Sequence, residues 1–99
     1  MATKKLGPLT LASVTTTGII QIDRGLFNVS LYGTWVATLI LQRSFDGGAN
    51  WLNVKTYNAN IEDVGEEPED NVQYRLNCTV YTSGTVTYII GQVMYASYR

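Results

Sequence analysis

The sequence predicts an all-β fold, an antiparallel β-sandwich that is jelly-roll-like and has seven or eight strands. Composition is the first reason, because Val, Ile, Thr, Tyr, Phe and Trp supply 39 of the 99 residues and these residue types favour strands. Apolar residues also alternate with period two along much of the chain. Turn residues recur roughly every 8 to 14 positions, a spacing typical of sandwiches and jelly rolls.

The N-terminal region is expected to be the least regular. Residues 1–8 end in Gly7-Pro8, which discourages regular structure, so we expect a flexible arm before a single domain over residues 9–99. The domain is predicted to open with a weak edge strand, a short strand and a turn, at residues 10–17, 19–23 and 23–25.

Two strands are predicted in the central region. Residues 26–32 alternate and place three apolar side chains on one face: Phe27, Val29 and Leu31. A turn is expected at Gly33-Thr34. Residues 35–43 are apolar on both faces, which suits a central strand covered on two sides.

The C-terminal region predicts a further pair of strands. Residues 72–81 alternate, with Tyr81 pointing outward and four side chains pointing inward: Tyr74, Leu76, Cys78 and Val80. After a tight turn expected at residues 82–84, the strand 85–92 returns with three inward side chains: Val86, Tyr88 and Ile90.

Composition also excludes several classes of function. The chain has no histidine, which removes Ser-His-Asp and Cys-His catalysis and the commonest zinc sites. Its single cysteine, Cys78, cannot form an internal disulfide. No apolar run approaches the ~20 residues of a membrane span. The net charge of −1 differs from the basic excess of nucleic-acid binders. We therefore expect no catalytic residue, cofactor or metal, and neither a membrane nor a nucleic acid as a partner.

A hairpin motif precedes the strand predicted at residues 51–57. Four positions match the Asp-box pattern Ser-x-Asp-x-Gly-x-Thr-Trp, with Asn50 in place of Thr: Ser44, Asp46, Gly48 and Trp51. An Asp side chain in a turn accepts hydrogen bonds from backbone N–H groups that follow it, and glycine adopts positive φ without strain. In sialidases such boxes lie away from the active site, so we interpret this single copy as a structural hairpin.

Six of the eight acidic residues lie within nine positions: Glu62, Asp63, Glu66, Glu67, Glu69 and Asp70. We expect a short strand at 61–64 and a solvated acidic loop at 65–71 that contacts basic groups of a partner. A calcium site is an alternative, because hard cations take clustered carboxylates, and paired carboxylates also serve glycosidases. Gly65 and Pro68 interrupt the run, which favours the interface. Lys4 and Lys5 in the arm are the basic interface candidates.

The eleven aromatic residues are divided between a core and a rim. Trp35, Trp51, Tyr74 and Tyr88 are predicted to fill the core. Tyr95 and Tyr98 are predicted to lie outside with Tyr81, and we include them among the interface candidates because Tyr is common at protein interfaces. The alternative is an aromatic platform that stacks on sugars.

Three segments form a series across the chain: Leu41–Gly48 with Trp51, Tyr74–Cys78, and Tyr81–Val86 with Gln92. This series resembles small virion proteins of tailed phages and prophages, over about two thirds of the chain. The resemblance implies a capsid decoration, or cement, protein with a β-sandwich or jelly-roll fold that clamps major capsid subunits together. Such proteins offer no catalytic residues to transfer, and their capsid-contacting residues vary.

The leading hypothesis is therefore a phage head decoration protein that binds and stabilises the major capsid shell. It would be made in the host cytoplasm and lie on the capsid surface of the virion. The alternatives are a tail, baseplate or fibre-associated virion domain, and a carbohydrate-binding module. Because a chain of 11.0 kDa is a weak clamp alone, we expect a homo-oligomer, either a trimer or a dimer.

Overall fold

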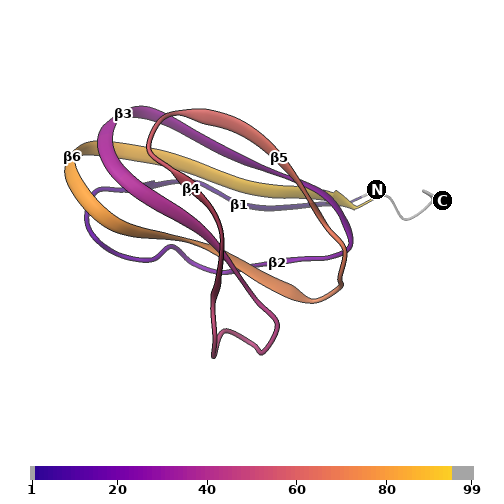
Figure 1. Ribbon diagram of the computed structural model, residues 1–99. Helices are drawn as coiled ribbons and strands as arrows, with labels where there is room; N and C mark the ends of the chain where they lie inside the picture. The colour runs from indigo at the N-terminus through magenta and orange to yellow at the C-terminus, as the bar shows by residue number, and fades with distance from the viewer. Residues whose placement is uncertain (1, 95–99) are drawn as a thin grey trace.

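The computed structural model describes residues 2–94, which form six strands and no helix (Figure 1). The strands are β1 (Ala2–Leu11), β2 (Ile20–Ile22), β3 (Gly25–Ser44), β4 (Leu52–Tyr57), β5 (Ile61–Glu67) and β6 (Val72–Met94). They form one antiparallel sheet in the order β1-β6-β3-β4, with β2 also beside β6 and β5 also beside β3. The predicted all-β antiparallel class is confirmed. The described part of the chain has no helix of the length and apolarity needed to cross a membrane.

Two long strands, β3 and β6, run through the whole sheet. Their pairing extends from Asn28 opposite Gly91 to Ser44 opposite Gln73. The first half of the sheet consists of β1, β5, the start of β3 and the end of β6. The second half consists of β2, β4, the end of β3 and the start of β6. Each long strand therefore belongs to both halves.

Glycines lie where the two long strands bend from one half to the other. Gly33 and Gly84 have φ of 108° and 85°, a region that residues with a Cβ rarely adopt. A Cβ at Gly84 would lie 2.2 Å from the backbone oxygen of Thr34. Both strands curve at the left of Figure 1 while they remain paired. The turns predicted at Gly33-Thr34 and at residues 82–84 are wrong, because the strands bend there together. Residues 2–94 therefore contain six strands instead of seven or eight.

The core contains the inward-facing side chains of both halves. The predicted inward side chains of the first half are buried: Phe27, Val29, Leu31, Val86, Tyr88 and Ile90. They join a single cluster with second-half residues that include Ala37, Leu39, Leu41, Tyr74, Leu76 and Cys78. The rings of Phe27 and Tyr74, which belong to different halves, have centroids 4.9 Å apart. The inner faces of the two halves are therefore in direct contact.

A β-bulge changes which side chains of β6 face the core. Thr79 is skipped in the pairing of β6 with β3, and this extra residue inverts the alternation until a second skipped residue, Thr82, restores it. Val80, predicted to point inward, is 54% exposed. Tyr81, predicted to point outward, packs partly buried against the core. Both predictions are wrong for this reason.

The N-terminal residues form a strand, β1, which pairs with β6 from Ala2 to Leu11. The flexible arm predicted for residues 1–8 is therefore wrong over residues 2–8. The Gly7-Pro8 signal behind that prediction marks an irregularity in a strand, since the register shifts between Leu6 and Leu9.

The segment between β1 and β2 is attached to β6 without being a strand, so the edge strand predicted at residues 10–17 is also wrong. The backbone N–H of Thr17 donates to the Leu76 oxygen at 2.9 Å, and that of Cys78 donates to the Thr15 oxygen at 2.8 Å. The Leu76 N–H in turn donates to the Thr17 hydroxyl at 2.9 Å.

Candidate functional site

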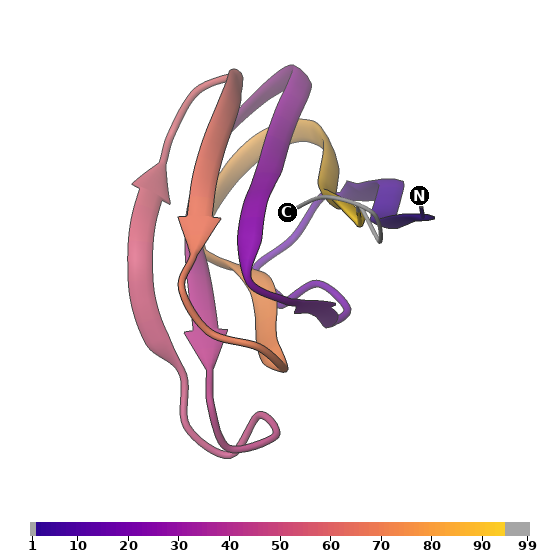
Figure 2. The ribbon, with the colours of Figure 1, turned by 90° about the vertical axis from the view of Figure 1, so that its right-hand side faces the viewer.

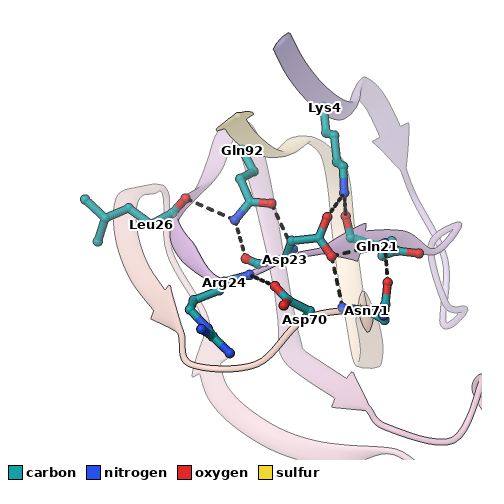
Figure 3. Close-up of polar contacts among 8 residues, drawn as sticks. All are labelled: Lys4, Gln21, Asp23, Arg24, Leu26, Asp70, Asn71 and Gln92. Atoms are coloured by element: carbon teal, nitrogen blue, oxygen red, sulfur yellow. Dashed lines mark hydrogen bonds and ion pairs between the residues drawn. The ribbon is translucent and has the colours of Figure 1, made fainter. Parts of the chain in front are cut away.

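A polar cluster closes one end of the first half (Figure 3). At its centre, the Asp23 carboxylate accepts hydrogen bonds from Lys4 Nζ at 2.6 Å, from the Asn71 N–H at 2.9 Å and from Gln21 Nε2 at 3.1 Å. The Lys4 ammonium, followed by the Asn71 N–H, lowers the pKa of Asp23 below its ordinary value. Asp23 is therefore ionised at neutral pH, and donors of this chain surround it.

Gln92 and Arg24 complete the cluster. The Gln92 side chain accepts a hydrogen bond from the Asp23 N–H at 2.9 Å and donates to the backbone oxygens of Asp23 and Leu26. The Arg24 N–H donates to the Asp70 carboxylate at 3.0 Å. These contacts hold the β2–β3 turn against the end of β6 and against the β5–β6 connection.

The polar cluster joins four segments that are distant in sequence, namely β1, the β2–β3 turn, the β5–β6 connection and the end of β6. The cluster fixes the relative positions of these segments and offers no good catalytic group, because an ionised and hydrogen-bonded Asp23 is a poor general base. Lys4 and Asp70, both predicted interface residues, lie in this cluster. Sequence reasoning missed Asp23 and Gln92 as members. The predicted turn at 23–25 was the only signal, and it gave no indication of the partners on β1 and β6.

A buried carboxylate links the two halves of the sheet. Glu67, the last residue of β5, has no exposed surface. It accepts hydrogen bonds from Arg43 Nε at 3.0 Å, Arg43 Nη2, the Tyr74 hydroxyl at 2.7 Å and the Glu69 N–H at 2.9 Å. Burial raises the pKa of the Glu67 carboxyl, but these hydrogen bonds and the Arg43 charge outweigh burial, so the pKa lies below its ordinary value. The prediction that Glu67 belongs to a solvated interface loop is wrong.

A second carboxylate on β5 bridges the edges of the two halves. Asp63 accepts hydrogen bonds from Lys55 Nζ at 2.8 Å and from the Tyr57 hydroxyl at 2.9 Å, both on β4. The Lys55 ammonium and then the Tyr57 hydroxyl lower the pKa of Asp63. Burial and the nearby carboxylate raise the pKa of Tyr57, which keeps its hydroxyl a donor.

The other predicted interface residues are distributed over the surface. Because β5 extends to Glu67, the acidic loop predicted at 65–71 begins only at Pro68. Glu62 accepts a hydrogen bond from the Ser30 hydroxyl at 2.7 Å. Glu62 remains exposed, as do three other predicted residues: Lys5, Glu66 and Glu69. Tyr95 and Tyr98 lie outside the described residues.

The predicted hairpin motif forms a turn held by its own side chains. The Ser44 hydroxyl donates to Asp46 at 2.7 Å and accepts a hydrogen bond from the Gly48 N–H at 3.0 Å. Asp46 also accepts hydrogen bonds from the backbone and side chain of Asn50, at 2.9 and 2.7 Å. The Asn50 contacts, followed by the Ser44 hydroxyl, lower the pKa of Asp46 to about 2. Asn50 thus serves where the Asp-box pattern has Thr.

The ring of Trp51 lies over the outside of the second half. The Arg75 guanidinium stacks on it at 4.1 Å from the centroid, and a Cβ at Gly48 would touch its edge at 3.4 Å. The prediction that Trp51 fills the core is wrong, whereas Tyr74 and Tyr88 are buried and Trp35 packs partly buried against the core. Trp51 instead connects the turn to β6.

A small cavity of about 110 Å³ opens between β4 and β5. Its lining comes from the core and from the two edge strands: Phe27, Val29, Leu41, Val54, Lys55, Tyr57, Asp63, Val64 and Gly65. Pockets for drug-sized ligands measure about 300–1,000 Å³, so this cavity holds at most a single side chain or a few atoms.

Neither metal-binding nor nucleophilic geometry stands out in residues 2–94. Those residues contain no group of three or more His, Cys, Asp or Glu side chains that could hold a metal ion. Cys78 is buried in the core, and burial raises the pKa of its thiol, so it is protonated and inert at neutral pH. Comparison with family models, curated proteins and solved structures finds no match to this chain.

Proposed function

We propose that this chain is a structural protein of a tailed-phage virion, a head decoration protein that binds the major capsid protein at the capsid surface and has no catalytic role. The observation that carries the proposal is the resemblance of three segments to small phage virion proteins. The first two segments are neighbours in space: β3 places Leu41 opposite Leu76 and Arg43 opposite Tyr74, and Arg75 stacks on Trp51. These two segments therefore form one connected part of the fold.

The disposition of the polar residues also supports a structural role. Asp23, Asp46, Asp63 and Glu67 all accept hydrogen bonds from this chain's own donors. They secure turns and connect strands of this fold. We also propose that the two halves, with their shared core, form a β-sandwich. The jelly-roll-like variant of this architecture stays a prediction.

Co-sedimentation with phage particles tests this function. Purified protein is mixed with undecorated heads, and separately with tails, of the phage or prophage that encodes it, and the pelleted protein is quantified. We expect saturable binding to heads, with a plateau at a fixed ratio to capsid subunits and displacement by unlabelled protein. Binding to tails alone would support a tail, baseplate or fibre domain instead. Absence of saturable binding to either particle would refute the proposal.

The salt dependence of binding to heads and the melting temperature of decorated heads provide a second readout. Docking through exposed charges weakens with salt, because charges beyond about 8–10 Å are screened at physiological ionic strength. A decorated head should also unfold at a higher temperature than a bare head, because binding to the assembled shell stabilises it. Equal melting temperatures at full occupancy would contradict a stabilising role.

A further inference from the structure

We propose that copies of this chain join edge to edge, with β1 of one copy pairing with β5 of the next and extending the sheet of the first half. Within the described residues, β1 pairs only with β6 and β5 only with β3. Each therefore presents one edge without a strand partner, on opposite sides of the molecule (Figure 2). Such an edge is a template for a strand from another chain. The inference concerns the isolated protein and does not depend on capsid binding.

The two edges carry opposite charges on the same face of the sheet. Lys5 on β1 and Val64 on β5 lie in one row across the sheet. Lys5 pairs with Gly91 of β6, Gly91 pairs with Asn28 of β3, and Asn28 pairs with Val64. Directly paired residues point to the same face, and residues two positions apart along a strand share it. Glu62 and Glu66 therefore flank Val64 on the face that carries Lys5. All four side chains are exposed.

Strand direction permits the junction. β1 is antiparallel to β6, β6 to β3, and β3 to β5, so a neighbouring β1 placed beside β5 in the same sheet runs antiparallel to it. If the neighbour's β1 continues the same row, its Lys5 lies opposite Val64. Glu62 and Glu66 are then its diagonal neighbours at about 7–8 Å, which the Lys5 ammonium can reach. Its methylene groups then cover Val64, which is 67% exposed. Pro8 has no N–H and limits the junction to residues 2–6 of β1.

A second copy fits this edge because of that complementarity. β5 presents an exposed apolar side chain between two acids, and β1 of the same chain presents a basic residue in the same row. The junction is head to tail, so repeated copies either close into a ring or grow into a chain. A small ring is consistent with the predicted homo-oligomer.

Charge reversal tests the junction through the mass of the purified protein in solution. The variants are Lys5→Glu and the double change Glu62→Lys/Glu66→Lys. We expect the wild type to be an oligomer at low salt by light scattering and to approach 11.0 kDa as salt increases. Each variant alone should be monomeric, because every junction then joins like charges. An equal mixture should assemble into chains or even-numbered rings in which the two variants alternate, because each junction between them again joins opposite charges.

Thermal melts of each variant by circular dichroism control for folding, since exposed substitutions change stability by only about 0.5 kcal/mol. A wild type that stays monomeric at all salt concentrations would overturn the proposal. So would variants that assemble as the wild type does, or a mixture of folded variants that remains monomeric.

A designed disulfide tests the register independently. In Lys5→Cys/Val64→Cys, the two positions of one copy are three strand spacings apart, about 14 Å, and a disulfide needs Cβ atoms about 3.5–4.5 Å apart. Any bond between these positions therefore joins two copies. We expect a ladder of multimers on a non-reducing gel, because a disulfide traps even brief encounters in this register although the Lys5 charge is lost. The control Lys5→Cys/Val80→Cys places the second thiol at an exposed site in the second half. Equal ladders from the two proteins would refute the proposed register.

Discussion

Replacing Glu67 with glutamine should destabilise the protein by about 3 kcal/mol. Each carboxylate oxygen accepts two hydrogen bonds, one pair from Arg43 Nε and the Tyr74 hydroxyl, the other from Arg43 Nη2 and the Glu69 N–H. The amide nitrogen of glutamine cannot accept, so two donors lose their partner. Hydrogen bonds to charged groups contribute about 1.5–3 kcal/mol each, and breaking a buried ion pair costs about 3–5 kcal/mol. The Arg43 side chain is 22% exposed and can regain some hydration, which favours the lower end.

The measurement is urea or thermal unfolding followed by circular dichroism, with Glu66→Gln as the matched control on the same strand. A loss of 3 kcal/mol should lower the melting temperature by about 12–24 °C in a domain of this size. Glu66 is exposed, and its substitution should change the free energy of unfolding by no more than about 0.5 kcal/mol. Equal melting temperatures for the two variants would refute the assigned role of Glu67.

The effect of Glu67 should also depend on pH with a defined sign. Because the pKa of Glu67 is lower in the folded chain than in the unfolded chain, its contribution is complete above the unfolded pKa. It is lost as the pH falls through the folded pKa. The stability difference between the wild type and Glu67→Gln should therefore shrink with acidification below about pH 4.3, the unperturbed value for Glu. Asp23, Asp46 and Asp63 titrate in both proteins and cancel in this difference. A difference that is constant from pH 7 to pH 2 would contradict the assignment.

Three further changes test the fold. Leu76→Ala should cost about 2–5 kcal/mol, because Leu76 is fully buried, whereas Asn77→Ala should cost little; equal losses in urea unfolding would mean that the register is wrong. Gly84→Ala should lower the melting temperature more than Gly47→Ala, because both have positive φ but only a Cβ at Gly84 meets backbone atoms; a similar effect of both would remove the steric argument. Deleting residues 2–8 should destabilise the isolated protein, because β1 pairs with β6; an unchanged melt would restore the view of these residues as a dispensable arm.

The alternation of apolar residues was sufficient to predict the core-facing side chains within each half. Phe27, Val29 and Leu31 are buried as expected, because period two persists wherever strand pairing is regular. The prediction failed where the pairing is irregular. The skipped residue Thr79 inverts the faces of Val80 and Tyr81, and the skipped Thr82 restores the original alternation. Nothing local distinguishes a bulge from an ordinary strand position. Gly84 illustrates a related difficulty, since a glycine among polar residues suits a chain reversal as well as a bend shared by two strands.

The candidate sites show the same difference between local contacts, which the sequence predicts, and long-range contacts, which it does not. The turn at Asp46 was predicted because its partners lie within six residues of one another in the sequence. Glu67 was misplaced because an acid within an acidic run is usually exposed, and its main partner, Arg43, lies 24 residues away. That contact exists only after β3 and β5 have been brought to the same end of the sheet. Long-range polar contacts of this kind leave no periodic signal in the sequence.

Sharing two strands between both halves affects how the molecule opens and forms. Both halves depend on β3 and β6, which run through the whole sheet. One half therefore cannot unfold while the other half keeps its strand pairing intact. Amide hydrogen exchange in the centres of β3 and β6 should therefore report a single global opening free energy instead of two separate cooperative units. In addition, paired residues such as Asn28 and Gly91 are separated in sequence by most of the chain, which forms a long loop between them. That loop must close before the pairing can stabilise it, which places folding in the millisecond-to-second range typical of sheet proteins with non-local contacts.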